Sequence, residues 1–290
     1  MDTLISLVSR HNKVFMRNRM LVFFSMLSVM IVILLYTIFL QKVQLDAIKQ
    51  LVPVTNAIEV MVNEWMVAGL LSIIAVTTTL AVFGIYVRDL ETKATADFLT
   101  TAVSRTKIQL SYVFSALVIG FGMSLVAFIS CEIFLLIIGA DILSFGKTVK
   151  VLGIILLSVV LSSTINLFSV LFVKTVTTFS TINTIVGSVI GFLCGVYVPI
   201  GALPSYVQSI IHYFPISHTT VLLRQTLMSD SVDTVFSGNE AAAASYMLTN
   251  GVQYELNGTV LSSGASVLYI VGTIVVVGAI SIYIFARKNK

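Results

Sequence analysis

The sequence predicts an all-α integral membrane protein, a single transmembrane domain over residues 1–290 with six spans. Hydrophobic residues make up 57% of the chain and charged residues 10%, whereas about a quarter of the residues in a soluble domain carry charge. Six apolar stretches approach or exceed the roughly 20 residues that a helix needs to cross a bilayer. They cover about 20–40, 66–87, 110–138, 150–173, 178–198 and 266–286. These stretches are continuously apolar, while the strands of a membrane barrel alternate, so the spans are predicted to be helices.

The orientation follows from lysine and arginine, which are enriched in cytoplasmic segments. With the N-terminus inside, twelve of the 17 cations fall on the cytoplasmic side, and the other five are Lys42, Lys49, Lys147, Lys150 and Arg224. Both termini are therefore predicted to be cytoplasmic. The basic charge balance reflects topology and contact with anionic membrane lipid, not nucleic acid.

Residues 1–19 are predicted to be a cytoplasmic amphipathic helix. Its apolar face holds Leu4, Val8 and Phe15, and the basic residues Arg10, Lys13 and Arg17 lie mostly elsewhere. This pattern is typical of a helix lying on the inner leaflet, with its apolar side in the lipid and its basic side toward the phosphates. The alternative is a disordered basic leader that only sets the topology.

The cytoplasmic loop over residues 88–107 is the candidate contact with a soluble partner. It holds seven of the chain's thirty charges: Arg88, Asp89, Glu91, Lys93, Asp97, Arg105 and Lys107. Leu90, Ala94 and Phe98 recur every four residues, so a short helix here would carry an apolar stripe. Such a helix could insert this stripe into a groove on a partner while the charges fix the register. A solvated loop is the alternative.

Few polar side chains fall inside the predicted spans. Glu132 is the one ionisable residue, and it is either functional or reaches the headgroups or the proline-rich segment from near the outer end of span three. Asn166 in span four is expected to form interhelical hydrogen bonds. Gly187 and Gly191 form a ridge suited to close helix contact. Because no acid lies near the midplane, an ion-driven carrier is disfavoured.

Residues 199–265 are predicted to form a re-entrant helical hairpin followed by a small external cap. Pro199, Pro204 and Pro215 cut the apolar part into Ser205–Phe214 and Ser217–Met228, each too short to cross. Since backbone at membrane depth must satisfy its own hydrogen bonds, both pieces are predicted to be helices that dip into the outer leaflet or pack on the spans. An ordinary external loop is the alternative. Residues 229–265 turn polar and small, and they are expected to form the cap.

The chain lacks the motifs of an enzyme. Gly146-Lys147-Thr148 resembles the end of a phosphate-binding loop, but Asp141 stands where that loop needs its first glycine. The three histidines, at positions 11, 212 and 218, have no metal-ligand spacing, and no nucleophile and base form a recognisable pair. We therefore expect no catalytic residue, no metal and no nucleotide site in this chain.

Two segments resemble those of the ABC type 2 family of transporter permeases. The run from Asp89-Leu90-Glu91 through Asp97-Phe98-Leu99 to Arg105 is similar to the family's cytoplasmic loop, in which acids precede a leucine-rich helix. Gly195, Pro199, Pro204, Pro215 and Arg224 are similar to the family's segment after span five. Ala94 and Ala102 stand where many members have glycine and proline. With six spans and a basic surface helix, the resemblance covers nearly the whole chain.

The resemblance implies a half-transporter of the bacterial plasma membrane, from the branch that exports drugs, lipids or peptides. Its six spans would pair with a second copy or a related permease. Two separate ATPase subunits would dock below and bind the ATP and magnesium that this chain does not hold. The implied cargo is amphipathic or hydrophobic and leaves the cell. The alternatives are an ATP-independent channel or carrier, and an immunity protein that sequesters a toxic peptide.

The resemblance, together with the polar span residues, assigns roles to individual side chains. Coupling to the ATPase is assigned to Asp89, Leu90, Glu91, Ala94, Asp97, Phe98, Leu99 and Arg105. The interface helix would brace this contact through Arg10, Lys13, Phe15 and Arg17. The translocation pathway or the re-entrant hairpin is assigned Glu132, Asn166, Gly195, Pro199, Pro204, Pro215 and Arg224.

Overall fold

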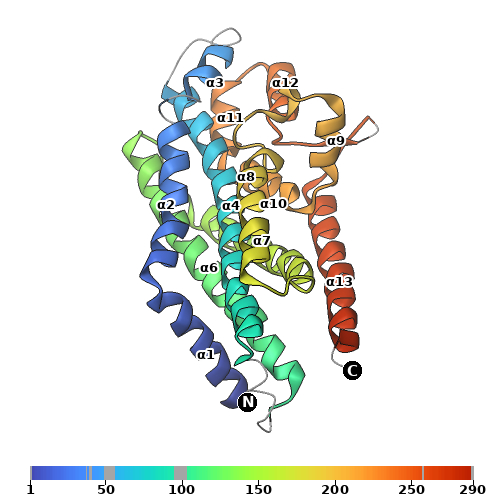
Figure 1. Ribbon diagram of the computed structural model, residues 1–290. Helices are drawn as coiled ribbons and strands as arrows, with labels where there is room; N and C mark the ends of the chain where they lie inside the picture. Colours follow the sequence, from blue (N-terminus) through green and yellow to red (C-terminus); the bar gives the residue numbers. More distant parts are fainter. Residues whose placement is uncertain are drawn as a thin grey trace.

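A computed structural model describes residues 2–36, 38, 41–48, 56–94, 103–256 and 258–288. In this part of the chain, helices form an elongated bundle with one two-stranded antiparallel hairpin (Figure 1). The longer helices are α1 (Asp2–Arg17), α2 (Arg19–Leu35), α4 (Asn56–Glu91), α6 (Arg105–Ile137), α7 (Phe145–Val170), α8 (Val176–Leu193) and α13 (Ser263–Lys288). The shorter elements are α3 (Gln41–Ile48), η2 (Ile200–Ala202), α9 (Ser205–Tyr213), α10 (Pro215–Leu227), α11 (Ser229–Val235), α12 (Glu240–Thr249), β1 (Glu255–Leu256) and β2 (Thr259–Val260). The predicted all-α membrane fold is confirmed.

Within the described residues, five helices are long and apolar enough to cross a membrane: α4, α6, α7, α8 and α13. The first expected span, over 20–40, corresponds to α2, which has 17 apolar-rich residues, and part of the expected range lies outside the described residues. Helix α4 begins at Asn56, well before the expected residue 66. Glu64 therefore lies on the same helix as the second expected span, two residues before its expected start. That Glu132 is the one ionisable residue within the spans stays a prediction.

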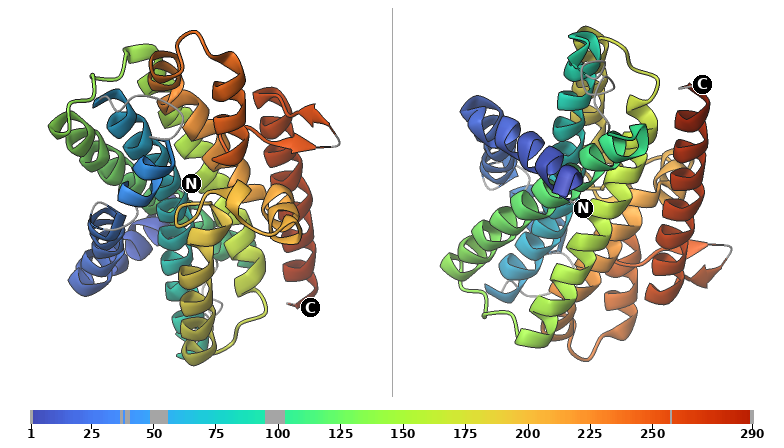
Figure 2. Two further views of the ribbon diagram at one scale, coloured as in Figure 1. Left: turned by 90° about the horizontal axis from the view of Figure 1, so that it is seen from above. Right: turned by 90° about the horizontal axis from the view of Figure 1, so that it is seen from below.

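Helix α4 is the centre of the bundle. The most apolar 18-residue window of α4 is 89% buried, whereas the corresponding windows of α8 and α13 are each 11% buried. Helices α6, α7, α8 and α10 all pack on α4, while α8 and α13 stand at the periphery (Figure 2). At 1.5 Å per residue, the 36 residues of α4 span about 54 Å, so the helix is longer than the roughly 30 Å of hydrocarbon is thick.

Polar side chains join α4 to its neighbours inside the bundle. The Asn166 side-chain amide on α7 donates to the Val76 carbonyl and to Thr79 Oγ1 on α4, both at 2.9 Å. The Thr219 hydroxyl on α10 lies 3.4 Å from Ser72 Oγ on α4 and 3.2 Å from Ser158 Oγ on α7. The interhelical role expected for Asn166 is thus observed. Each such bond in a membrane contributes modestly, about 0.6–2 kcal/mol.

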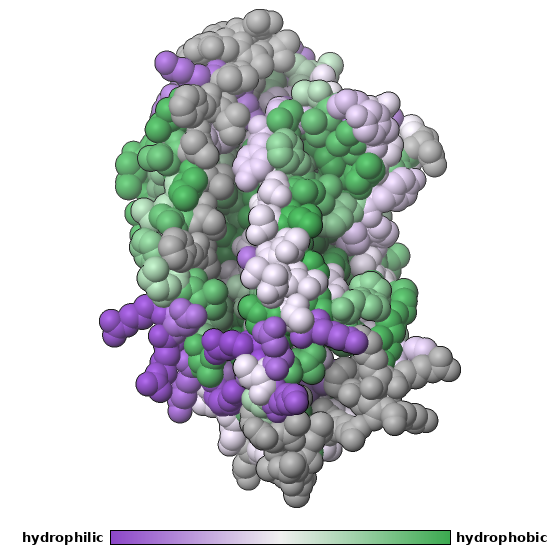
Figure 3. Space-filling view, viewed as in Figure 1, coloured by the Kyte–Doolittle hydropathy of each residue, from purple (hydrophilic) through white to green (hydrophobic). Residues whose placement is uncertain are grey.

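The two ends of the bundle differ in charge. We call one end the basic end; it holds α1, the end of α4 and the start of α6, where basic residues 10, 13, 17 and 88 gather (Figures 1 and 3). We call the opposite end, with α3, α9, α11 and α12, the cap end. Helix α13 returns from the cap end, so it finishes near the same end as α1 (Figure 1).

The segment after span five is helical, as predicted. Helices α9 and α10 occupy the two predicted short pieces, and α10 is almost entirely buried against α4, α7 and α13. Pro199 and Pro204 precede η2 and α9, and Pro215 is the first residue of α10, where its missing N–H costs nothing. In the cap, β1 and β2 pair across Gly258, whose φ is +78°. The helical hairpin of α9 and α10 therefore packs on the spans, through α10, rather than forming an open external loop.

Close contacts within the bundle occur at other glycines than the ones predicted, among them Gly69, Gly84 and Gly120. A Cβ at Gly187 would meet no atom within 4 Å, and one at Gly191 would collide with the Tyr197 ring. By contrast, a Cβ at Gly69 on α4 would lie 2.3 Å from Cγ2 of Val196, in the turn after α8. The predicted ridge is thus not a helix contact within the described chain, and Gly69 sets the distance between α4 and this turn.

We predict that Gly69→Ala lowers the free energy of unfolding by about 1–3 kcal/mol, because the new Cβ would lie 2.3 Å from Cγ2 of Val196, a short, β-branched and fully buried side chain. Gly153→Ala is the matched control, since a Cβ at Gly153 on α7 would meet nothing within 4 Å. That control should leave stability unchanged or raise it by up to about 1 kcal/mol. Unfolding in detergent, followed by circular dichroism, measures both; equal effects of the two substitutions would contradict the prediction.

Candidate functional site

The functional residues predicted from sequence gather mainly at the basic end and the cap end of the central helix. At the basic end, α1 packs against α4 and α6 instead of lying on lipid alone. Phe15 and His11 are fully buried, while Lys13 and Arg17 stay exposed. The prediction that the basic face of this helix points to lipid phosphates is therefore wrong for Arg10, which faces α4. The physical reason is a buried carboxylate at the end of α4.

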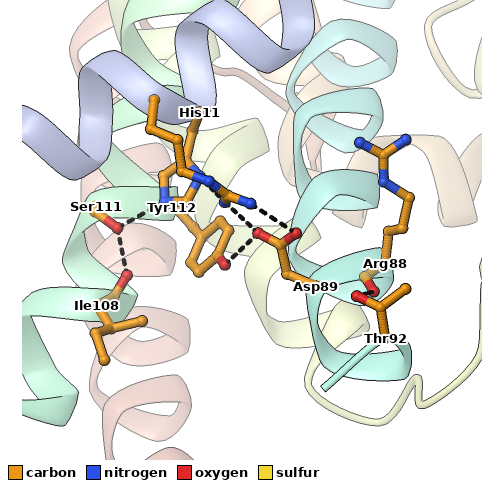
Figure 4. Close-up of polar contacts among 8 residues, drawn as sticks. His11, Arg88, Asp89, Thr92, Ile108, Ser111 and Tyr112 are labelled. Atoms are coloured by element: carbon orange, nitrogen blue, oxygen red, sulfur yellow. Dashed lines mark hydrogen bonds and ion pairs between the residues drawn. The ribbon is translucent and has the colours of Figure 1, made fainter. Parts of the chain in front are cut away.

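That carboxylate belongs to Asp89, which holds α1 and α6 to the end of α4 (Figure 4). Arg10 Nη1 lies 2.5 Å from Asp89 Oδ2, and Arg10 Nη2 lies 3.2 Å from Oδ1. The Tyr112 hydroxyl on α6 donates to Asp89 Oδ2 at 2.8 Å. The Asp89 side chain is 6% exposed and that of Arg10 is 36% exposed. Such a two-point guanidinium–carboxylate contact fixes orientation as well as distance, and the hydrogen bond to Asp89 raises the pKa of Arg10.

The next residues of α1 extend the same contact onto α6. The His11 ring stacks on Tyr112 with centroids 4.0 Å apart, and His11 Nε2 lies 3.0 Å from Ser111 Oγ. Because the Ser111 hydroxyl donates to the Ile108 carbonyl, Nε2 of His11 carries the proton and donates to Ser111. Burial, with the neighbouring Arg10 charge, lowers the pKa of His11 to about 4, so this ring is neutral at pH 7. We call Arg10, His11, Asp89, Ser111 and Tyr112 the basic-end clamp.

The predicted coupling segment lies next to this clamp. Asp97, Phe98 and Leu99 lie outside the described residues, and of Arg105 only the backbone, at the first position of α6, is described. Glu91 is exposed, and its Oε2 accepts from the backbone N–H of Val176 at the start of α8 at 3.3 Å. Leu90 is 36% exposed, and Ala94 is partly exposed just beyond α4. The end of α4 and the start of α6, which flank this segment, thus contact α1 and α8 as well as each other.

At the cap end, Arg224 of α10 is fully buried in a cage of backbone carbonyls. Its Nη2 donates to the carbonyls of Cys194 and Gly195 at 3.2 and 2.8 Å, and its Nη1 donates to those of Asn250 and Gly251 at 3.1 and 3.3 Å. In the described part of the chain, no acidic side chain forms an ion pair with Arg224. The four carbonyls follow the C-terminal ends of α8 and α12, where helix dipoles place partial negative charge.

An indole ring and two turns complete this cage, which we call the carbonyl cage. The Arg224 guanidinium carbon lies 4.3 Å from the centroid of the Trp65 ring on α4, and Trp65 Nε1 donates to the Asn250 carbonyl at 2.6 Å. Gly195 and Gly251 have φ values of +61° and +63°, which an L side chain rarely adopts. Burial lowers the pKa of Arg224 to about 10, so it remains a cation at pH 7. The cage therefore joins α4, α8, α10 and the cap.

Sequence reasoning singled out Arg224 and Gly195 but missed Trp65, Asn250 and Gly251. Asn250-Gly251 is a turn dipeptide within the expected cap, but nothing in that pattern indicated that its carbonyls bind a cation. Glu132 lies close enough to Glu64 for the two carboxyl groups to interact, and each has one buried oxygen without a hydrogen bond in the described part of the chain. Within the described residues, no group of histidine, cysteine and acidic side chains could hold a metal ion.

We predict that Asp89→Asn loosens α1, because Arg10 loses its carboxylate partner. The expected cost is about 1–2 kcal/mol, less than for a fully buried pair, since the Arg10 side chain remains 36% exposed. Hydrogen exchange of the α1 amides should become faster. Exchange as slow as in the original chain would argue against the clamp, and Lys13→Gln, which removes an exposed and unpaired charge from α1, is the control.

We predict that Arg224→Gln lowers the stability of the cap end by about 3–5 kcal/mol, since up to four carbonyls lose a charged donor. Trp65 is the single tryptophan, so its fluorescence reports the cage directly. Its emission should shift to longer wavelength as water reaches the ring. Lys42→Gln, at an exposed cation on α3, should leave emission and stability unchanged; an unshifted spectrum in Arg224→Gln would contradict the cage.

Comparison with protein families gives one match that covers most of this architecture. Residues 3–228 match the family model of the ABC-2 type transporter, a range that includes the basic-end clamp, all spans up to α8, and Arg224. A search of curated proteins found no match. The chain therefore belongs to the ABC-2 type transporter family, and it is the membrane permease component of an ABC transporter.

Proposed function

We propose that this permease is half of an ATP-driven exporter, in which two permease copies, or this chain and a related permease, work with two separate ATPase subunits. The observation that carries the proposal is the basic-end clamp. The segment that would meet the ATPase, residues 88–107, begins and ends on α4 and α6, and Asp89 joins both helices to α1. A push on this segment would reach three helices at once.

The surface of α8 supports a pathway or an interface between permeases. Its exposed polar residues are Thr177, Thr178, Ser180, Thr181, Asn183, Thr184 and Ser188. Several of these hydroxyls, such as those of Thr181 and Thr184, donate to carbonyls of α8 itself. The Asn183 side chain forms no hydrogen bond within the described residues, and lipid would leave it unsatisfied. We infer that this face of α8 meets water, substrate or a second permease.

A groove at the basic end favours an amphipathic substrate. It has a volume of about 430 Å³ and lies between the α1–α2 junction, α4 and α8. Phe15, Leu21, Ile85 and Phe179 contribute apolar surface, and Asn18, Arg88 and Asn183 contribute polar groups. If the basic end faces the cytoplasm, as the positive charge there favours, a drug, lipid or membrane-active peptide would load from inside. Loading from that side favours export from the bacterial cell.

Co-purification from the native membrane tests this proposal. We predict that the tagged permease brings down an ATPase that binds ATP and magnesium, and that Phe98→Asp abolishes both the complex and ATP turnover, because a charge then replaces the residue expected in the partner's groove. Ile142→Asp is the matched control, since Ile142 is 79% exposed in the loop before α7 at the cap end. It should preserve complex and turnover.

Three results would contradict the proposal. An intact complex with unchanged ATP turnover in Phe98→Asp would place the coupling contact elsewhere. Transport that survives full depletion of ATP, with no ATPase recovered, would favour an ATP-independent channel or carrier. Binding of a peptide without efflux would instead favour a sequestering immunity protein.

A further inference from the structure

A second pocket lies at the cap end, away from the groove just described. Its volume is about 660 Å³, within the usual range of small-molecule sites. The walls come from α7, α10, α11, α12, the β hairpin and the first residue of α13. The family match ends at residue 228, so most of the wall is built by residues beyond the matched range. The cap therefore adds a concavity that the matched part of the chain does not complete.

Three of the charged residues that line this pocket, one basic and two acidic, have no partner within the described chain. Lys150 comes from α7, and Asp233 and Glu240 come from α11 and α12. All three are exposed, and none forms an ion pair or a hydrogen bond in the described part of the structure. The neighbouring Lys147 differs, because it pairs with Asp230 at 2.5 Å and donates to Ser229 at 2.7 Å. The pocket thus offers a free cation from a span and two free acids from the cap.

Buried apolar side chains lie beside these charges. Met228 is fully buried and Val252 is 3% exposed, and Met247 is partly exposed on α12. Methionine adapts its shape to different apolar groups. A ligand that matches this lining has an apolar body, an ammonium group and a carboxylate.

A short apolar peptide with free ends has all three features. A phospholipid fits less well, because the apolar lining comes from the hairpin and the cap, and only Lys150 and Ser263 belong to span helices. A lipid tail would need a continuous surface along the spans. The pocket instead suits a ligand that arrives from water.

We propose that this pocket binds a short apolar peptide as a zwitterion. Its ammonium group lies at Asp233 and Glu240, its carboxylate lies at Lys150, and its side chains pack on Met247. This site is separate from the proposed coupling to an ATPase and holds whether or not that coupling exists.

Calorimetry on the full-length chain in lipid nanodiscs tests the proposal with the dipeptide Leu-Phe as the probe. We expect saturable binding of the free dipeptide, weakened by about three- to tenfold when its amine is acetylated or its carboxylate is amidated. Lys150→Gln should weaken binding of the free dipeptide by a similar factor but leave binding of the amidated form unchanged. The double change Asp233→Asn and Glu240→Gln should weaken binding of the free dipeptide by a similar factor but leave binding of the acetylated form unchanged.

Asp230→Asn is the matched control, since Asp230 lies on the same short helix as Asp233 but outside the pocket lining. It should leave all affinities unchanged. Because the substituted side chains are exposed, circular dichroism should show folded variants. The proposal is overturned if Leu-Phe does not bind, if the free and blocked dipeptides bind equally, or if phosphatidylethanolamine in the nanodisc displaces the dipeptide from the site.

Discussion

The position of α1 depends on one buried carboxylate, Asp89, at the end of the most buried helix of the bundle. A charge at that depth is stable only with a partner, and Arg10 and Tyr112 supply one from each neighbouring helix. Most residues at the centre of α4 are apolar and buried, so packing alone gives its neighbours little directional information. Polar contacts supply that information: Ser72 and Thr79 bond α10 and α7 at the centre, and the basic-end clamp and the carbonyl cage act at the two ends.

The cage solves a different electrostatic problem from the clamp. Arg224 has no carboxylate in the described part of the chain, yet it remains buried, because two helix C-termini and the Trp65 ring supply negative potential from groups that carry no net charge. The carbonyl groups point at Arg224 only while the turns after α8 and α12 are folded, so this stabilisation is lost when the turns open. The cation therefore stabilises the junction of α8 and the cap only while both turns keep their left-handed glycines.

Much of the fold follows from the sequence, because a long apolar stretch is a strong signal for a membrane-spanning helix. The apolar stretches became helices, and Pro199, Pro204 and Pro215 marked the hairpin breaks. The site was less predictable. Arg10 and Asp89 are separated by 79 positions, and an amphipathic face packs equally well on lipid or on protein, so the pattern could not reveal the clamp. Backbone carbonyls leave no residue signature, which is why the partners of Arg224 were missed.

The contacts at the basic end differ in strength, and this difference determines which helices move together. Asp89, whose side chain is 6% exposed, makes three polar contacts with Arg10 and Tyr112. These contacts join α1, α4 and α6 at this end of the bundle. Glu91 makes one exposed hydrogen bond of 3.3 Å to the start of α8, where water competes. Force on the 88–107 segment would break this contact first. Helix α8 would then be held to α4 by packing alone, including the close contact between Gly84 and Phe179, both of which line the 430 Å³ groove.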